Sequence, residues 1–130
     1  IQYADLLKVF WAAHDPTTLN RQGADVGTQY RSVIYTTTES QVKDAKTSLE
    51  TEQVRQADQK LFGCIPMSRK VVTEIEPLQE FFSAESYHQN YYQKAPYIPY
   101  CAVNIAPKLV KIRSKFRDLL REEGYDDDDE

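Results

Sequence analysis

The sequence predicts an α+β fold in which a mixed sheet is flanked by helices. Apolar residues recur at helical spacing in some segments, and β-branched and aromatic residues gather in short runs in others. Hydrophobic residues make up 41% of the 130 residues, which suits one packed domain. Only two strands are convincing, and an isolated strand pair is marginal in water. Either a third strand is hidden in the sequence, or part of the sheet is missing from this chain.

The first predicted helix covers residues 3–14, where apolar residues form one face: Tyr3, Leu6, Leu7, Phe10 and Ala13. Asp15 ends this helix because it precedes Pro16, and the residue before a proline disfavours the helical conformation. Residues 17–28 are polar and contain two glycines, which predicts a long loop. Long ordered loops are often functional. Residues 29–36 are rich in β-branched and aromatic side chains and predict a strand.

A capping box predicts where the second helix begins. The side chains of Thr38 and Gln41 are expected to satisfy each other's free backbone N–H groups. The helix that follows carries apolar residues on one side and is expected to end at Gly63; these residues are Val42, Ala45, Leu49, Ala57 and Leu61. Residues 70–75 predict a second strand, which Pro77 closes.

The last third of the chain predicts two helices and a short extended segment. Ser83 is expected to cap a short helix over residues 83–92. Residues 101–105 are expected to be a strand or extended segment. Pro107 suits the first turn of a last helix that ends at Gly124. One face of this helix is apolar and the other basic; the apolar residues are Leu109, Ile112, Phe116 and Leu119.

Composition argues against several classes of partner. The net charge of -4 and the pI near 5.2 argue weakly against nucleic acid. No apolar run approaches the roughly 20 residues that a membrane span needs, and we expect no signal peptide. Residues 121–130 predict an acidic, disordered tail after a domain that covers residues 1–120. Because the chain opens without a methionine, we expect that it was cut from something longer.

The metal-ligating residue types do not form a site in the sequence. Cys64 and Cys101 are far apart and form no CxxC pair, which argues against both zinc and a disulfide scaffold. His14 and His88 lack a third ligand, and His14 is better explained as the residue that ends the first helix. We therefore expect no metal, no cofactor and a reducing cytoplasm as the compartment. Cys64 is expected to be a small, partly buried apolar residue, and the same interpretation is an alternative for Cys101.

Three segments of the sequence are distinctive when they occur together. The segments are His14-Asp15-Pro16-Thr17 with Asn20-Arg21-Gln22-Gly23, then Asp25-Val26-Gly27-Thr28-Gln29-Tyr30-Arg31-Ser32, and finally Ala84-Glu85-Ser86-Tyr87-His88-Gln89. Over roughly residues 1–120 the chain closely resembles the class A peptide methionine sulfoxide reductases. The resemblance implies a truncated form of that family's two-layer, ferredoxin-like sandwich.

The resemblance also implies an activity, which is reduction of methionine-S-sulfoxide, free or in oxidised proteins, to methionine. In the family a cysteine thiolate attacks the sulfoxide sulfur while acid groups and hydroxyls supply hydrogens to the departing oxygen. The cysteine leaves as a sulfenic acid. A second thiol converts it to a disulfide, and thioredoxin reduces that disulfide.

Matched by position, the resemblance gives a partial site. Asp25 matches the acidic residue of the family loop, as site acid or water-positioning group, and Tyr30 matches a tyrosine that binds the sulfoxide oxygen. Tyr87 and His88 match a pair at the rim of the site. Cys101 lies where members with recycling thiols carry them and is a candidate for thiol relay. Alternatively, Asp25 is an ordinary turn residue and Tyr30 a core residue.

The sequence departs from the family at the nucleophile. The family cysteine lies in a Gly-Cys-Phe-Trp-Gly motif, whereas the one Phe-Trp pair here, Phe10-Trp11, follows Val9. The family's principal acid, a glutamate, and a further tyrosine are expected upstream of Ile1. We therefore expect an N-terminally truncated chain that is inactive alone. The alternatives are a non-catalytic binding protein and an incomplete gene-model fragment.

Overall fold

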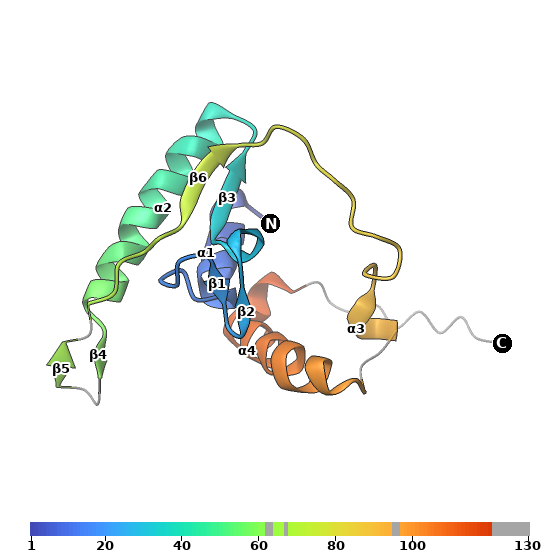
Figure 1. Cartoon of the computed structure of the whole chain (residues 1–130). Coiled ribbons are helices and arrows are strands. Elements are labelled where there is room, and N and C mark those ends of the chain that lie inside the picture. The colour runs from blue at the N-terminus through green and yellow to red at the C-terminus, as the bar shows by residue number, and fades with distance from the viewer. Residues whose placement is uncertain (62–63, 67, 95–96, 121–130) are drawn as a thin grey trace. The chain divides into compact units, whose positions relative to one another are not determined.

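The computed structural model describes residues 1–61, 64–66, 68–94 and 97–120 (Figure 1). The chain falls into two compact units, Ile1–Gln89 and Asn90–Glu130. In chain order the elements are α1 (Tyr3–Ala13), β1 (Arg21–Gln22), β2 (Asp25–Val26), η1 (Thr28–Tyr30), β3 (Val33–Thr36), α2 (Glu39–Ala57), β4 (Lys60–Leu61), β5 (Ile65–Pro66), β6 (Glu74–Pro77), α3 (Tyr91–Lys94), η2 (Cys101–Ile105), α4 (Ala106–Lys115) and η3 (Arg117–Leu119). The predicted α+β class is confirmed.

The central sheet of the first unit consists of β3 and β6, which are parallel and begin at the same edge (Figure 1). Val33 pairs with Glu74 and Thr36 pairs with Pro77. Because side chains alternate along a strand, Ile34 and Thr36 point into the unit while Tyr35 faces solvent. The other described strands form two separate antiparallel pairs, β1–β2 and β4–β5.

Both predicted strands are displaced from their observed positions. The strand predicted from residue 29 begins only at Val33, since residues 28–30 form the 3-10 turn η1. The strand predicted over residues 70–75 begins at Glu74 and includes Pro77. Pro77 is tolerated there because it is the last residue of the strand, and the hydrogen bond to Thr36 at this end is donated by Leu78.

The core of the first unit lies where α1 and α2 meet the sheet. Its buried members come from both helices, from β3 and from the segment before β6; they are Leu7, Trp11, Ile34, Ala45 and Val71. The predicted face of α1 is confirmed for Leu7, and Tyr3 and Phe10 are partly buried against the core. The prediction is wrong for Leu6, which is exposed, because the buried face of α1 runs instead through Leu7 and Trp11, which lie one helical turn apart.

Helix α2 begins at the predicted cap, with one change of partner. The Thr38 side chain accepts a hydrogen bond from the backbone N–H of Gln41 at 3.2 Å, as expected. The Gln41 side chain, however, accepts from the backbone N–H of Thr37 at 2.8 Å rather than from that of Thr38. Thr38 is therefore the N-cap, as predicted, and the Gln41 side chain bonds to the residue before the cap.

Helix α2 ends at Ala57, before the predicted stop at Gly63, which lies outside the described residues. The hairpin β4–β5 follows, and its pairing takes Lys60 and Leu61 out of any helix. The buried side of α2 is formed by Ala45, Glu52 and Gln56, whereas Ala57 is exposed. The predicted apolar side is therefore wrong in its last turns, where buried polar residues replace it.

The helix predicted over residues 83–92 is wrong. Residues 78–85 form no helix or strand and are all exposed, so they have no apolar face whose burial would stabilise a helix. Turns follow, and Asn90 has a left-handed backbone with φ 54. Of the predicted range, only Tyr91 and Tyr92 are helical, in the short helix α3 that begins after this turn.

The second unit contains α4, which has the predicted proline in its first turn. The predicted apolar face is confirmed, because Leu109, Ile112, Phe116 and Leu119 are half-buried while the residues between them are exposed. The strand expected over residues 101–105 is wrong: these residues form a turn of π-helix, η2, that runs directly into α4. The helix ends at Lys115, and Gly124 lies outside the described residues.

Within the described part of the chain, none of the helices combines the length and the apolar character that a membrane crossing requires.

Candidate functional site

The loop over residues 15–31 carries the two main predicted site residues. It is not irregular throughout, because β1 and β2 pair as a small antiparallel hairpin inside it. The turn of this hairpin uses the left-handed Gly23, with φ 60. The backbone N–H of Gly27 donates to the carbonyl of Asn20 at 2.9 Å, which closes the hairpin at its other end.

Asp25 and Tyr30 lie on consecutive elements of this loop. Asp25 is half-buried in β2, where it pairs with Gln22. Tyr30 is the last residue of η1, and its side chain is 40% exposed. This exposure excludes the alternative that Tyr30 is a core residue. The loop therefore holds a carboxyl and an accessible phenol on neighbouring elements.

Gly27 determines how the chain passes from the hairpin into η1. Its φ of 145 is a conformation that residues with a side chain rarely adopt. A Cβ atom at this position would also overlap the side chain of Gln29. The carbonyl of Gly27 then accepts from the backbone N–H of Tyr30 at 3.0 Å, which forms the turn that ends at Tyr30.

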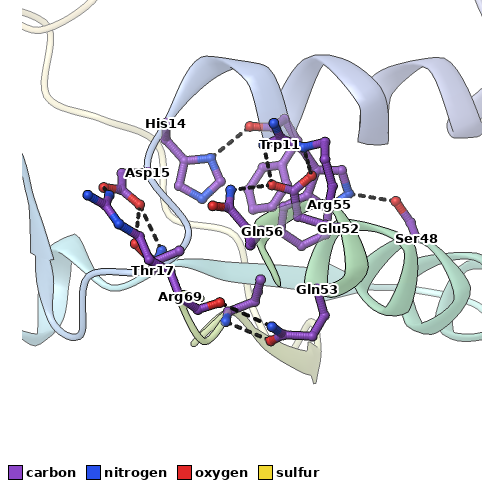
Figure 2. Close-up of polar contacts among 12 residues, drawn as sticks. Trp11, His14, Asp15, Thr17, Ser48, Glu52, Gln53, Arg55, Gln56 and Arg69 are labelled. Atoms are coloured by element: carbon purple, nitrogen blue, oxygen red, sulfur yellow. Dashed lines mark hydrogen bonds and ion pairs between the residues drawn. The ribbon is translucent and has the colours of Figure 1, made fainter. Parts of the chain in front are cut away.

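Asp15 organises the start of the loop. Its Oδ1 accepts from both the backbone N–H of Thr17, at 2.9 Å, and the Thr17 hydroxyl, at 2.6 Å (Figure 2). The side-chain amide of Gln22 accepts a hydrogen bond from the backbone N–H of Asp15 and donates one to its carbonyl. Burial opposes ionisation of Asp15, but the Thr17 hydrogen bonds and the charges of Arg69 and His14 outweigh it, so its pKa is lowered.

His14 joins the end of α1 to the beginnings of both parallel strands. Its Nδ1 lies 2.7 Å from the carbonyl oxygen of Phe10, and its Nε2 lies 2.7 Å from Oγ of Ser32. Oγ of Ser32 lies 2.7 Å from Oγ1 of Thr73, and both of these side chains are buried. The prediction that His14 ends a helix is confirmed. Its link to Ser32 and Thr73 had no signal in the sequence, because it joins residues that are far apart in the chain.

Arg31 holds the other end of the loop from the outer face of the sheet. It donates to Glu74 at 3.1 Å, to the carbonyl of Thr28 at 3.1 Å and to the hydroxyl of Tyr35 at 2.9 Å. The hydrogen bond to Glu74, with the nearby charges, raises the pKa of Arg31. The turn η1 is thus tied to β3 and β6 by one side chain.

A group of polar side chains on α2 lies beside the end of α1 (Figure 2). Oγ of Ser48 accepts from the indole N–H of Trp11 at 2.6 Å. Glu52 is 4% exposed and accepts from Arg55 and from the Gln56 amide. These hydrogen bonds satisfy the polar side chains that are buried on α2, so we assign these side chains a structural role.

Tyr87 and His88, the predicted rim residues, lie on an exposed turn. Their rings are 4.3 Å apart between centroids. Nδ1 of His88 lies 3.0 Å from a carboxylate oxygen of Glu85. A backbone hydrogen bond and the His88 contact lower the pKa of Glu85. Both rings are largely exposed, and their hydrogen bonds and ring contacts are local to the turn.

The two cysteines are free thiols. Cys101 is fully buried at the start of η2 in the second unit. Cys64 is exposed, so the prediction of partial burial is wrong for it; it lies in the turn between β4 and β5. Among the described residues, no group of three or more His, Cys, Asp or Glu side chains is placed to hold a metal ion.

A family model and several relatives of this chain agree on one family. The family model described as peptide methionine sulfoxide reductase matches residues 1–120. A relative from Acinetobacter baumannii (strain AYE) named peptide methionine sulfoxide reductase MsrA is 47% identical over 121 residues, which are 93% of this chain and 63% of the relative. A relative of the same name from Deinococcus radiodurans is 48% identical over 124 residues, which are 93% of this chain and 54% of the relative. The chain thus spans less than two thirds of the length of these relatives.

Solved structures agree with the sequence comparisons. The reduced form of Mxr1 from Saccharomyces cerevisiae matches with a TM-score of 0.63 and 36% identity, over 75% of this chain and 48% of that chain. Methionine sulfoxide reductase A of Corynebacterium diphtheriae matches with the same TM-score and identity, over 76% and 48%. The fold, the loop and these matches agree, and the chain belongs to the peptide methionine sulfoxide reductase family.

Proposed function

We propose that this chain carries the oxygen-binding side of a site that reduces methionine-S-sulfoxide, free or in oxidised proteins, to methionine. The observation that carries the proposal is the ordered 15–31 loop, which holds Asp25 and Tyr30 on neighbouring elements and joins them to the sheet. Membership of the family supports the same substrate class.

The two residues suit different parts of the reaction. When a thiolate attacks the sulfoxide sulfur, the sulfur–oxygen bond breaks and the oxygen must gain hydrogens. The Tyr30 phenol donates a hydrogen bond without carrying charge to the substrate, and its exposure leaves it accessible. Asp25 acts as a site acid or positions a water molecule. Tyr87 and His88 contribute to the rim.

The complete reaction needs two thiols and a reductant. The first thiol takes the oxygen and becomes a sulfenic acid, the second displaces it as water and forms a disulfide, and thioredoxin reduces that disulfide. Of the two cysteines here, neither lies in a Gly-Cys-Phe-Trp-Gly motif. We therefore propose that the 130 residues bind the sulfoxide but do not turn it over by themselves.

Cys101 is our candidate for the relay thiol. It lies in a π-helical turn, a rare conformation that often marks functional positions. Because its side chain is buried, relay requires that η2 opens to expose the thiol. The free thiols support a reducing cytoplasm as the compartment. We also propose that residues 1–120 form the family domain and that 121–130, which lie outside the described residues, form an acidic tail.

The second candidate function is non-catalytic binding of oxidised methionine. The absence of the nucleophile motif from the 130 residues favours it. A protein with this function binds methionine sulfoxide as the reductase does, but it does not reduce it. A longer form of the protein with an in-frame Gly-Cys-Phe-Trp-Gly segment upstream would favour the enzyme instead.

Titration of the ¹⁵N-labelled chain with N-acetyl-methionine-(S)-sulfoxide methylamide tests the proposal. We expect shifts in the amides of residues 25–30, and weaker shifts with the R epimer or the thioether. Tyr30→Phe should weaken binding by roughly fivefold, the effect of one lost hydrogen bond. Tyr97→Phe is the matched control, because Tyr97 is almost fully exposed in the second unit. Equal shifts with both epimers, or with the thioether, would refute the proposal.

A further inference from the structure

His14 contacts the chain at both ends of the 15–31 loop. It is the residue immediately before the loop, and its Nε2 lies 2.7 Å from Oγ of Ser32, the residue immediately after it. Ser32 in turn lies 2.7 Å from Thr73 and accepts from the backbone N–H of Glu74 at 3.0 Å through its own carbonyl. One imidazole therefore joins α1, β3 and the beginning of β6.

We propose that His14 is a positioning residue that closes the 15–31 loop at its base and thereby holds Asp25 and Tyr30 in place. The proposal rests on the proposed function for the roles of Asp25 and Tyr30. His14 itself is not assigned a contact with the substrate.

The hydrogen-bond partners of His14 determine which ring nitrogen carries the proton. The carbonyl of Phe10 can only accept, so Nδ1 must donate to it across 2.7 Å. In the neutral ring Nε2 is then the acceptor, and the Ser32 hydroxyl donates to it. The Ser32 oxygen is left to accept from the Thr73 hydroxyl. The geometry thus requires a proton on Nδ1, and in the neutral ring it sets a single direction for the three hydrogen bonds.

Loss of one hydrogen bond in the series His14–Ser32–Thr73 would leave a buried hydroxyl without its partner. The Ser32 and Thr73 side chains are buried, so a hydroxyl that loses its partner there cannot be rehydrated without opening the base of the loop. The ring is also fixed sideways by Phe10, whose centroid lies 4.3 Å away. A change at His14 is therefore transmitted first to the loop and not to the far end of the sheet.

Two amide variants separate the two nitrogens of the ring. In His14→Gln the longer side chain places an amide near the position of Nε2, so the link to Ser32 is kept. In His14→Asn the shorter side chain places the amide near Nδ1, so only the Phe10 link is kept. Hydrogen exchange of the Gly27 and Tyr30 amides reports on the loop, because both are donors in its backbone hydrogen bonds. The Leu78 amide, bonded to Thr36 at 2.9 Å at the other end of the sheet, is the control.

We expect His14→Asn to speed exchange of the Gly27 and Tyr30 amides by about five- to tenfold, the effect of one lost hydrogen bond, and to leave Leu78 unchanged. His14→Gln should stay within about twofold of the wild type, and Ser32→Ala should behave like His14→Asn. Equal effects of Asn and Gln, or parallel acceleration at Leu78, would overturn the proposal, because a merely structural residue lowers protection everywhere.

A measurement on the unchanged protein decides the matter if the variants do not fold. In ¹⁵N spectra of the neutral His14 ring, Nδ1 should show the shift of a protonated nitrogen and Nε2 that of an unprotonated one. The reverse assignment would overturn the proposal. Failure of the wild type to bind the sulfoxide would remove the roles of Asp25 and Tyr30, while the exchange and ¹⁵N data would still decide whether His14 closes the loop.

Discussion

Arg31 donates from Nε to Oε2 of Glu74 across 3.1 Å, which joins the residue after Tyr30 to the first residue of β6. The same guanidinium reaches the Thr28 carbonyl and the Tyr35 hydroxyl. The turn that presents Tyr30 is thus attached to the outer face of the sheet, as His14 attaches the loop on the inner side.

We predict that Arg31→Lys loosens this turn without unfolding the protein. A lysine ammonium cannot reproduce the planar fork that serves three acceptors at once. Exchange of the Tyr30 amide should rise severalfold, while the melting temperature should change little because the pair is exposed. Arg117→Lys, at an exposed arginine of the second unit, is the control. A large drop in melting temperature with no local change at Tyr30 would contradict this account.

The buried carboxylate of Glu52 makes the stability of α2 depend on Arg55. Arg55→Ala removes two charged hydrogen bonds from a carboxylate that water cannot reach, and should lower the free energy of unfolding by about 1–3 kcal/mol. We expect a loss near 1 kcal/mol, the lower end of this range, because the Arg55 side chain is 53% exposed and water screens its charge. Urea unfolding measures the change, with Lys46→Ala on the same helix as control.

Replacing the carboxylate itself tests the same argument from the other partner. Glu52→Leu replaces the buried carboxylate with an apolar side chain and should cost less than Arg55→Ala, because no charge is then left buried without Arg55. If Glu52→Leu is the more damaging change, the carboxylate has a role that its contacts with Arg55 and Gln56 do not explain.

Asp15 should make the protein more stable above its ordinary pKa than below it. Its pKa is lowered in the folded state, so the folded carboxyl loses stabilisation only as the pH falls below its usual value of 3.8. Asp15→Asn should therefore lower stability near neutral pH by less than about 1 kcal/mol, since the side chain is 40% exposed. The difference from wild type should disappear as the pH falls from 3.8 through the lowered folded-state pKa. Asp118→Asn, at an exposed aspartate, is the control. A difference that grows in acid would contradict the sign.

We predict no thioredoxin-linked turnover of methionine sulfoxide by the 130-residue chain. The physical reason is that the 130 residues contain no thiol in the family's nucleophile motif, and Cys101 is buried. NADPH consumption in the presence of thioredoxin and thioredoxin reductase measures the rate. Turnover that disappears in Cys101→Ser and persists in Cys64→Ser would refute the prediction and identify Cys101 as a nucleophile.

The features that could be predicted from the sequence are those that neighbouring residues determine. The end of α1 at Asp15-Pro16, the Thr38 cap and the proline in the first turn of α4 all act within one turn of a helix. The predicted strand positions were wrong because the register of β3 against β6 depends on residues some forty positions apart. The prediction for residues 101–105 was wrong because their β-branched residues have no strand partner and instead form a helical turn that runs into α4.

The candidate site was predictable only as a set of residue types. Asp25 and Tyr30 were identified from the pattern of the octet, and their loop was expected to be long and functional. The hydrogen-bond chain through Ser32 and Thr73 was not, because no local pattern states which buried hydroxyl meets His14. The burial of Cys101 and the exposure of Cys64 likewise follow from tertiary structure.

Gly27 gives the loop a particular sensitivity to substitution. A residue with a side chain would displace the flexible end of Gln29 and would have to adopt a φ of 145, so even alanine strains the backbone of the turn. In a library that samples every amino acid at each position of 15–31, position 27 should accept the fewest replacements. Position 23 should accept more replacements, because a Cβ there would lie in open space. Its backbone is left-handed, a conformation that asparagine adopts readily.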